Sequence, residues 1–177
     1  NNFDVDTEAD DMKKDVLGGK DGWDPTKYLN IWVCDIVSAS GVIGYSYLPG
    51  TVQWSMWKDG LVVDFQHFGT TIGTSGDGRT PTHEIGHYLG LFHTFCSDQN
   101  GNPPSCDDCD DSFFAGNIND TPASKDIYFG SVNASTNNNT CNDLNYANAF
   151  NTDVLDMDEN YMSYAQNTWM FTNSQVD

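Results

Sequence analysis

Three segments in the first half of the chain have the hydrophobic pattern of β-strands. Residues 28–36 are apolar at both odd and even positions, which predicts a strand buried on both faces of a sheet. Residues 42–48 form a second candidate, which ends at a Pro-Gly pair. Residues 61–68 alternate between apolar and polar side chains, as expected for an edge strand with one buried face. We therefore expect a small sheet with residues 61–68 at its edge.

A predicted helix follows a loop rich in glycine and threonine at residues 69–78. Thr80 can cap this helix, because its side-chain oxygen can accept a hydrogen bond from a free backbone amide in the first turn. Pro81 fits the same turn, since the amide hydrogen that proline lacks has no partner there. The helix is expected to run to about Leu89.

The remaining segments have no sustained periodicity. Residues 1–27 are polar and contain glycines, so we expect an irregular segment with one short helix near residues 10–16. Residues 97–160 are rich in asparagine, aspartate and glycine. Such a segment cannot bury enough apolar surface to order itself, so we expect long loops held by disulfides or metal ions.

The composition is that of a folded domain with a strongly acidic surface. The chain has 177 residues, of which 26 are acidic and 7 basic, and its formal net charge is −19. This charge would repel a phosphate backbone, which argues against a nucleic-acid-binding protein. No stretch approaches the roughly 20 apolar residues of a membrane span. Cationic peptides and divalent cations fit the charge, and we expect a monomer.

Four of the five cysteines cluster in the polar second half of the chain. Cys34 stands alone in an apolar run and is expected to be a buried core thiol. Of the three ways to pair the other four, we favour the disulfides Cys96–Cys109 and Cys106–Cys141. The spacing of Cys106 and Cys109 also suits half of a structural zinc site or a redox pair. No second cysteine pair or adjacent histidine completes such a site, which favours disulfides in an extracellular protein.

The strongest chemical signal is the motif H-E-x-x-H-x-x-G-x-x-H, which begins at His83. Residues four apart on a helix are separated by about 400° of rotation and about 6 Å of rise, so His83 and His87 project from one face. His93 can join them only if the helix ends before it, and Gly90 permits this because glycine readily adopts the left-handed conformation. Three neutral imidazoles suit a zinc ion with a fourth position open to water. Glu84 can then take a proton from that water as general base.

A second motif lies downstream at residues 160–164, Asn-Tyr-Met-Ser-Tyr, and supplies the Met-turn of metzincin proteases. With the zinc motif, it makes the chain resemble the pappalysin family of metzincins. Supporting matches occur over about residues 10–175, at Tyr28–Val33, Asp59–Val63, Gly78–Thr80, His93–Phe95 and Asp120–Pro122.

The resemblance implies an α+β, metzincin-like fold and a single catalytic domain. An upper subdomain of about residues 1–90 would hold a mixed twisted sheet and the active-site helix. An irregular lower subdomain of about residues 91–177 would be tied by disulfides. The domain is expected to be incomplete at both ends, because the family has further elements there.

The resemblance also implies roles for residues outside the zinc motif. Met162 would form an apolar floor beneath the zinc, and Tyr164 would stabilise the oxyanion of the reaction. Substrates would pair with the edge strand, which we expect at residues 61–68. Structural calcium is expected near Asp120 and Thr121, in a loop with many oxygen ligands.

One position bears on substrate preference. Some pappalysins select a basic residue after the scissile bond through an aspartate, and Asn139 stands at that position here. Asp143 is the nearby acid that can substitute for it. A preference for basic residues near the scissile bond therefore rests mainly on the net negative charge.

We therefore expect a secreted, extracellular zinc endopeptidase that hydrolyses proteins or peptides by attack of a zinc-bound water. The alternative is an acidic, calcium-loaded binding or adhesion module with a vestigial zinc site. Glu84 distinguishes the two, because a protein without catalysis has no chemical need for a carboxylate at that position.

Overall fold

The computed structural model has two compact units, Asn1–Leu89 and Gly90–Asp177, which are described separately. The structure describes residues 1–69, 78–95, 106, 118–146 and 148–177. Within these ranges, no helix combines the length and hydropathy needed to cross a membrane.

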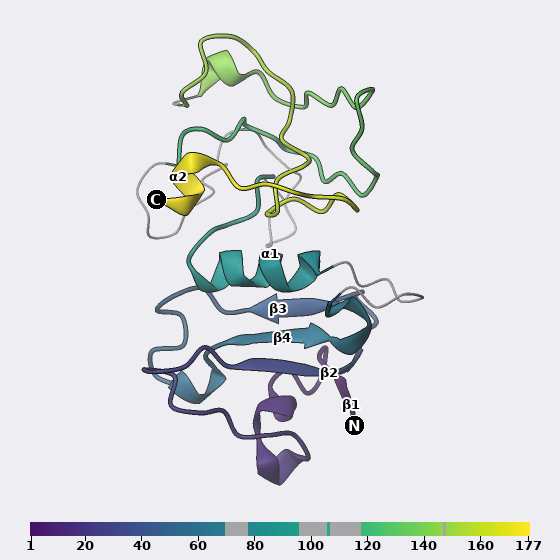
Figure 1. Cartoon of the computed structure of the whole chain (residues 1–177), viewed down its shortest axis with the longest axis vertical. Coiled ribbons are helices and arrows are strands. Elements are labelled where there is room, and N and C mark those ends of the chain that lie inside the picture. The colour runs from purple at the N-terminus through teal and green to yellow at the C-terminus, as the bar shows by residue number, and fades with distance from the viewer. Residues whose placement is uncertain (70–77, 96–105, 107–117, 147) are drawn as a thin grey trace. The chain divides into compact units, whose positions relative to one another are not determined.

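The first unit is built on a four-stranded mixed sheet with the order β1-β2-β4-β3 (Figure 1). Its strands are β1 (Asn2–Asp4), β2 (Ile31–Val37), β3 (Gly44–Ser46) and β4 (Leu61–Asp64). β1, β2 and β4 run parallel to one another, whereas β3 pairs antiparallel with β4. The mixed sheet agrees with the predicted fold class.

The prediction of an edge strand at residues 61–68 is wrong. β4 covers only Leu61–Asp64, lies between β2 and β3, and is buried at all four positions. A 3-10 helix, η4 (Phe65–His67), follows it, and the Asp64 side chain accepts a hydrogen bond from the Gln66 amide at 2.9 Å. Of the polar positions that suggested alternation, Asp64 is the buried last residue of β4 and Gln66 belongs to the turn. The edge strands are β1 and β3.

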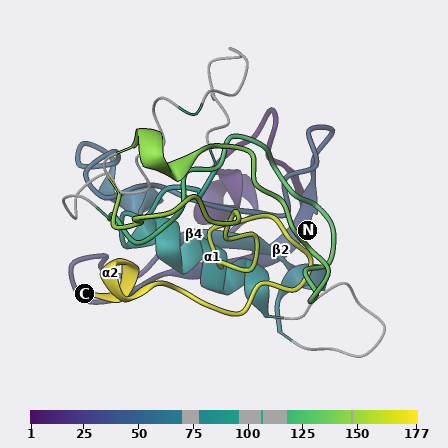
Figure 2. The ribbon, with the colours of Figure 1, turned by 90° about the horizontal axis from the view of Figure 1, so that it is seen from above.

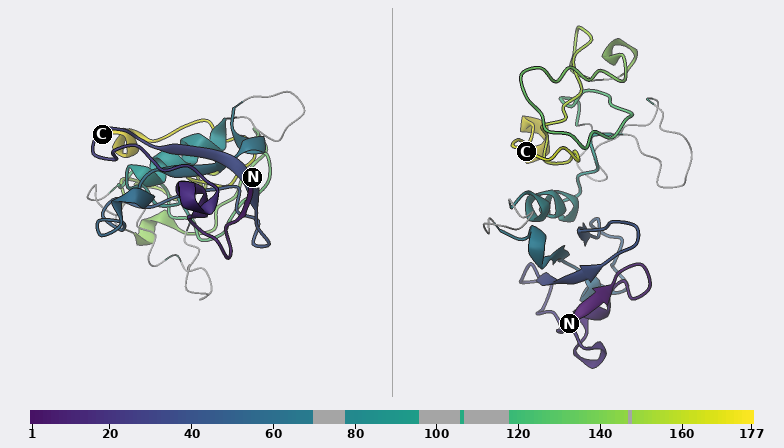
Figure 3. Two further views of the ribbon diagram at one scale, coloured as in Figure 1. Left: turned by 90° about the horizontal axis from the view of Figure 1, so that it is seen from below. Right: turned by 90° about the vertical axis from the view of Figure 1, so that its right-hand side faces the viewer.

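The prediction that residues 28–36 are buried on both faces also needs correction. In β2, Ile31 is 42% exposed and Val33 is 44% exposed. Helix α1 (Arg79–Tyr88) packs on β3 and β4, so it covers only part of the sheet face (Figure 3, right). β1 was missed because three residues are too few to show a period.

The opposite face of the sheet carries the main core of this unit. Trp32 on β2 pairs with Val62 on β4, and both pack with Phe3 and Met12. Met12 belongs to the 3-10 helix η1 (Asp11–Lys13), which a second one, η2 (Asp15–Leu17), follows closely. The short helix expected near residues 10–16 is thus two single 3-10 turns.

Lys13 anchors η1 to the sheet through a buried charge. Its side chain is 1% exposed, and its Nζ lies 3.2 Å from Asp10 Oδ1 and 4.8 Å from the Tyr45 ring centroid. Lys58 Nζ contacts the other Asp10 oxygen at 2.9 Å, and Tyr47 donates to it at 2.7 Å. A buried charge of this kind is stable only with such partners.

Helix α1 begins at Arg79, two residues earlier than it would with Thr80 as its N-cap. The N-cap is Gly78, in the left-handed conformation with φ 78°, and the Thr82 hydroxyl donates to the Gly78 carbonyl at 3.1 Å. A glycine fits here because the backbone must turn sharply into the helix. Most of the loop predicted at residues 69–78 lies outside the described residues.

The second unit is largely irregular in its described parts, as expected (Figure 2). It contains one 3-10 turn, η5 (Asp143–Asn145), and a short C-terminal helix, α2 (Asn173–Val176). The Asp143 side chain is buried and accepts hydrogen bonds from the amides of Ala123 at 2.9 Å and Val154 at 3.1 Å. Such bonds to a buried carboxylate replace the regular backbone pairing that these loops lack.

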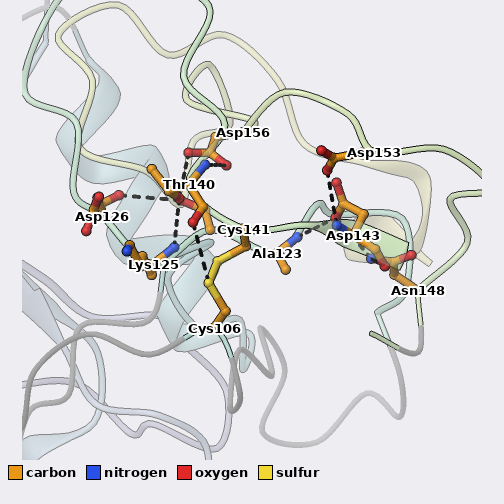
Figure 4. Close-up of a disulfide and its surroundings, with 11 residues drawn as sticks. Cys106, Ala123, Lys125, Asp126, Thr140, Cys141, Asp143, Asn148, Asp153 and Asp156 are labelled. Atoms are coloured by element: carbon orange, nitrogen blue, oxygen red, sulfur yellow. Dashed lines mark hydrogen bonds between the residues drawn. A yellow bond between two sulfur atoms is a disulfide. The ribbon is translucent and has the colours of Figure 1, made fainter. Parts of the chain in front are cut away.

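A disulfide joins Cys106 to Cys141, the pairing favoured from the sequence, with a Cα–Cα distance of 5.9 Å (Figure 4). Cys96 and Cys109, the other predicted pair, lie outside the described residues. Cys34 is a free thiol but only partly buried, because β2 is not enclosed on both sides. Burial nevertheless raises the pKa of Cys34 to about 11.

Candidate metal centre

Three histidines form a group suited to a metal ion. His83 and His87 lie one turn apart on α1, with ring centroids 4.7 Å apart and ring planes at 87°. The ligand atoms of His83, His87 and His93 all lie within 4.8 Å of one another. Among the described residues, no other cluster of three or more histidine, cysteine or acidic side chains has this arrangement. A set of three imidazoles is a typical donor set for catalytic zinc.

Gly90 has the backbone conformation that the motif requires. Its φ is 104°, and α1 ends at Tyr88. The Leu89 amide still donates to the Ile85 carbonyl at 3.0 Å, so the helical hydrogen bonds stop just before the glycine. A left-handed residue after a helix lets the chain leave the helical path, which a third histidine six residues beyond His87 needs.

Glu84 is a buried carboxyl group next to the first histidine. It is 5% exposed, and its Oε2 atom has no hydrogen-bond partner. Burial raises the pKa of Glu84 to about 8 in the protein alone. A divalent cation at the histidines would favour the charged carboxylate and lower this value. A buried carboxylate oxygen without a hydrogen-bond partner is suited to bind a water molecule and to accept its proton.

Met162 lies in the core of the second unit. It is fully buried and packs with Leu91 and Ile118. Its carbonyl accepts a hydrogen bond from the Thr94 amide at 3.3 Å, and Thr94 is the residue after His93. The Met-turn is therefore bonded directly to the segment that carries the third histidine.

Asn160 is a supporting residue whose role the sequence does not indicate. It is fully buried, and its Oδ1 accepts from the Met162 amide at 2.9 Å. Its Nδ2 donates to Gln175 Oε1 at 2.7 Å, which connects the turn to helix α2. In the sequence, Asn160 is only the first residue of the Met-turn motif. The motif does not indicate which groups its side chain hydrogen-bonds.

Tyr164 packs against the third histidine. Its ring centroid lies 4.8 Å from that of His93 and 5.0 Å from that of Phe95. The side chain is 40% exposed, so part of it is open to solvent. Packing thus fixes the ring of Tyr164 beside a candidate metal ligand.

The residues expected to bind calcium have mixed surroundings. Asp120 Oδ2 accepts from the Ser174 amide at 3.0 Å, whereas its Oδ1 is buried without a partner. Burial acts to raise the pKa of Asp120, but hydrogen bonds from Thr172 and Ser174 outweigh it, and the pKa is lowered. Thr121 is buried. The acidic residues 107–111 lie outside the described residues.

The two residues considered for substrate preference have different environments. Asn139 is exposed, and its Nδ2 donates to Asp153 Oδ2 at 3.1 Å. Asp143 is 1% exposed, and its carboxylate also accepts from Asn148 Nδ2 at 3.0 Å (Figure 4). Asp143 is thus enclosed by its hydrogen bonds to the surrounding loops, and the exposed acid beside Asn139 is Asp153.

The structure is similar to solved structures of mirolysin. Mirolysin in complex with compound 9 matches with a TM-score of 0.76 and 32% identity, over 99% of this chain and 58% of that chain. Mature mirolysin of Tannerella forsythia, in complex with a cleaved peptide, matches with a TM-score of 0.73 and 31% identity, over 96% and 57% of the two chains. The fold is therefore the mirolysin-like metzincin fold.

Curated relatives include fungal proteins named extracellular metalloproteases. One from Arthroderma benhamiae is 38% identical over 101 residues, which is 54% of this chain and 32% of the relative. Another from Podospora anserina is 32% identical over 122 residues, or 65% of this chain and 36% of the relative. The chain thus spans about a third of the length of these relatives.

A family model described as pregnancy-associated plasma protein-A, Peptidase M43, matches residues 10–177. The match includes the three histidines, Glu84 and the Met-turn. The chain therefore belongs to this family of peptidases, the pappalysins.

Proposed function

We propose that this chain is the catalytic part of an extracellular zinc endopeptidase. The observation that carries the proposal is the group of three histidines next to Glu84, a buried carboxyl group with an unpartnered oxygen. Family membership and the names of the fungal relatives support both the reaction and the extracellular location. The binding-module alternative is not favoured, because no such protein is among the similar proteins described above.

Zinc held by His83, His87 and His93 would polarise the scissile carbonyl and lower the pKa of a bound water towards about 7. Glu84 would accept the proton of this water and pass it to the nitrogen of the leaving amine. The Tyr164 hydroxyl would donate a hydrogen bond to the oxyanion that develops on the carbonyl. Met162 would support the third ligand through its backbone bond to Thr94.

The substrate would bind as an extended strand at one edge of the sheet. Of the two edge strands, β1 and β3, the candidate is β3, which packs against α1 and runs antiparallel to β4. Main-chain pairing along β3 would give affinity with little dependence on sequence. Mature mirolysin, solved with a cleaved peptide, supports a peptide substrate for this fold.

We infer a preference for basic residues near the scissile bond from charge. The chain carries a net charge of −19, and Asp153 places an exposed carboxylate beside Asn139. Structural calcium at Asp120 and Thr121 would satisfy the unpartnered Asp120 oxygen. Residues 1–90 and 91–177 would form the upper and lower parts of one catalytic domain, active as a monomer.

The test is cleavage of casein in the presence of zinc and calcium, with wild-type protein compared with Glu84→Gln. The variant keeps the shape of the side chain but cannot take a proton, so we expect cleavage to fall by at least about 100-fold. Bound zinc, measured by elemental analysis, should stay the same in both. Mass spectrometry of the products would reveal any basic residue beside the cut sites. A folded, zinc-loaded wild type that leaves casein intact would contradict the proposal.

A further inference from the structure

Gly44, on the edge strand β3, lies against the carboxylate of Glu84. It is paired with Val63 on β4, and its missing side chain would point towards α1. A Cβ atom built at Gly44 would lie 3.2 Å from Glu84 Oε1, 3.0 Å from Thr80 Cγ2 and 3.2 Å from the Val62 carbonyl oxygen. All three distances are shorter than ordinary van der Waals contacts.

The backbone does not explain why this position is a glycine. Gly44 is not among the glycines with positive φ, so an L-residue could adopt its conformation without strain. What a larger residue would change is the space next to the helix. The neighbour on the active-site side is the Glu84 carboxylate itself.

Hydrogen bonding does not fix the Oε2 oxygen of that carboxylate. Glu84 Oε2 is buried and has no hydrogen-bond partner, and the whole side chain is 5% exposed. An enclosed group without such a bond is positioned by the atoms packed around it. A Cβ atom at Gly44 would meet Oε1 at 3.2 Å, so any side chain at this position would press on the carboxylate from β3.

We propose that Gly44 is a positioning residue for the reaction proposed above, because its missing Cβ leaves the space in which the Glu84 carboxylate lies against β3. A methyl group there would displace the carboxylate by a few tenths of an ångström. Proton transfer is sensitive to such shifts, since a misplacement of 1 Å can cost about 100-fold in rate. The inference rests on the proposed function for its kinetic consequence, but the packing contact can be tested separately.

The kinetic test compares wild type with Gly44→Ala on a fluorogenic peptide chosen from the mapped casein cut sites. We expect kcat to fall about tenfold, with KM within twofold and zinc content unchanged. This split distinguishes a displaced Glu84 from a damaged substrate site, which would raise KM. A kcat within twofold of wild type would overturn the inference while leaving the proposed function intact.

The Thr80→Ser variant tests whether the loss of kcat in Gly44→Ala arises from contact with Glu84 or from contact with Thr80. It removes the methyl group that a Cβ at Gly44 would meet and keeps the hydroxyl group. Thr80→Ser alone should have wild-type kinetics. If the effect passes through Glu84, the double variant G44A/T80S stays as slow as G44A. Recovery of wild-type kcat in the double variant would show that the methyl contact is responsible, and would overturn the role of Gly44 towards Glu84.

A melting-temperature cycle tests the contact without using activity. Gly44→Ala should lower Tm by several degrees in the wild type and by less than half as much in a Glu84→Ala background, because the crowded carboxylate is then gone. An equal loss in both backgrounds would overturn the contact. If zinc-loaded wild type cleaves no substrate, both the proposed function and the kinetic role of Gly44 fail. The Tm cycle would still show whether a side chain at position 44 contacts Glu84.

Discussion

A catalytic role of Tyr164 requires its hydroxyl group, whereas a packing role requires only its ring. The ring is held beside His93 and Phe95 by aromatic contacts, which phenylalanine would preserve. The Tyr164→Phe variant should therefore fold and bind zinc normally. If the hydroxyl donates to the developing oxyanion, kcat should fall about 100-fold with little change in KM. Steady-state kinetics on a peptide substrate would measure this.

The control for Tyr164 is a variant that removes the ring as well. Tyr164→Ala should lose both the hydroxyl and the packing against His93, and so should also lower zinc affinity. Equal kcat values for Tyr164→Phe and wild type would mean that the residue only supports the histidine.

At the scale of elements, the attachment of η1 to the sheet depends on a buried ion pair. Burial alone would raise the pKa of Asp10, but hydrogen bonds from Lys58 and Tyr47 and the charge of Lys13 outweigh it. The pKa of Asp10 therefore lies below its ordinary 3.8 in the folded protein. A carboxyl group with a lowered pKa stabilises the fold above pH 3.8, and this contribution is lost as the pH falls through the lowered value.

Asp10→Asn should remove this contribution. It leaves Lys13, which is 1% exposed, without its charged partner, so we expect a loss on the order of 3 kcal/mol in unfolding free energy at pH 7. The difference between wild type and variant should shrink as the pH is lowered below 3.8, because Asp10 is then protonated in the wild type as well. Denaturant unfolding between pH 7 and 3 would measure both effects. A difference that is independent of pH would contradict this account.

The disulfide is the covalent constraint on the described loops of the second unit. Cys106 and Cys141 are separated by 35 residues, so closing this loop should contribute about 2–4 kcal/mol. Replacing both with alanine should lower the melting temperature of the second unit. Cys34→Ala is the matched control, because this free thiol closes no loop. Calorimetry would compare the two, and similar transitions in both variants would contradict a stabilising role for the bond.

At the scale of the whole molecule, the net charge of −19 should act on substrate association. Cationic peptides are attracted by such a charge over distances that salt screens, with a Debye length of about 8 Å at physiological ionic strength. The kcat/KM for a peptide with lysine or arginine should therefore fall as sodium chloride is raised from about 0.05 to 0.5 M. A neutral peptide of the same length is the control. Parallel salt dependence of the two would mean that charge does not guide the substrate.

Much of the candidate site could be predicted from local sequence, because its residues are close along the chain. Helical geometry alone places His83 and His87 on one face, and Gly90 indicates where the helix must end. The Met-turn was also identified by its motif. These predictions depend on short-range stereochemistry, which does not change with the rest of the fold.

The order of the strands could not be predicted in this way. Residues 61–68 were expected at the edge because apolar and polar residues alternate there, but Asp64 is buried and accepts a hydrogen bond from the Ile36 amide at 2.9 Å. In the sequence, a polar residue that hydrogen-bonds to a neighbouring strand cannot be distinguished from one that faces water. Only the pairing of strands distinguishes them.

The sequence by itself determined the family and predicted the metal ligands and the general base, because these are encoded in residue types at fixed short spacings. Only the tertiary structure decided that β3 rather than β4 is an edge strand, that Asn160 holds the Met-turn, and that Gly44 lies against Glu84. Gly44 and Glu84 are 40 positions apart, and no periodic pattern links a glycine in one strand to a carboxylate on a later helix. Their contact exists because β3 pairs with β4 and α1 packs on both strands.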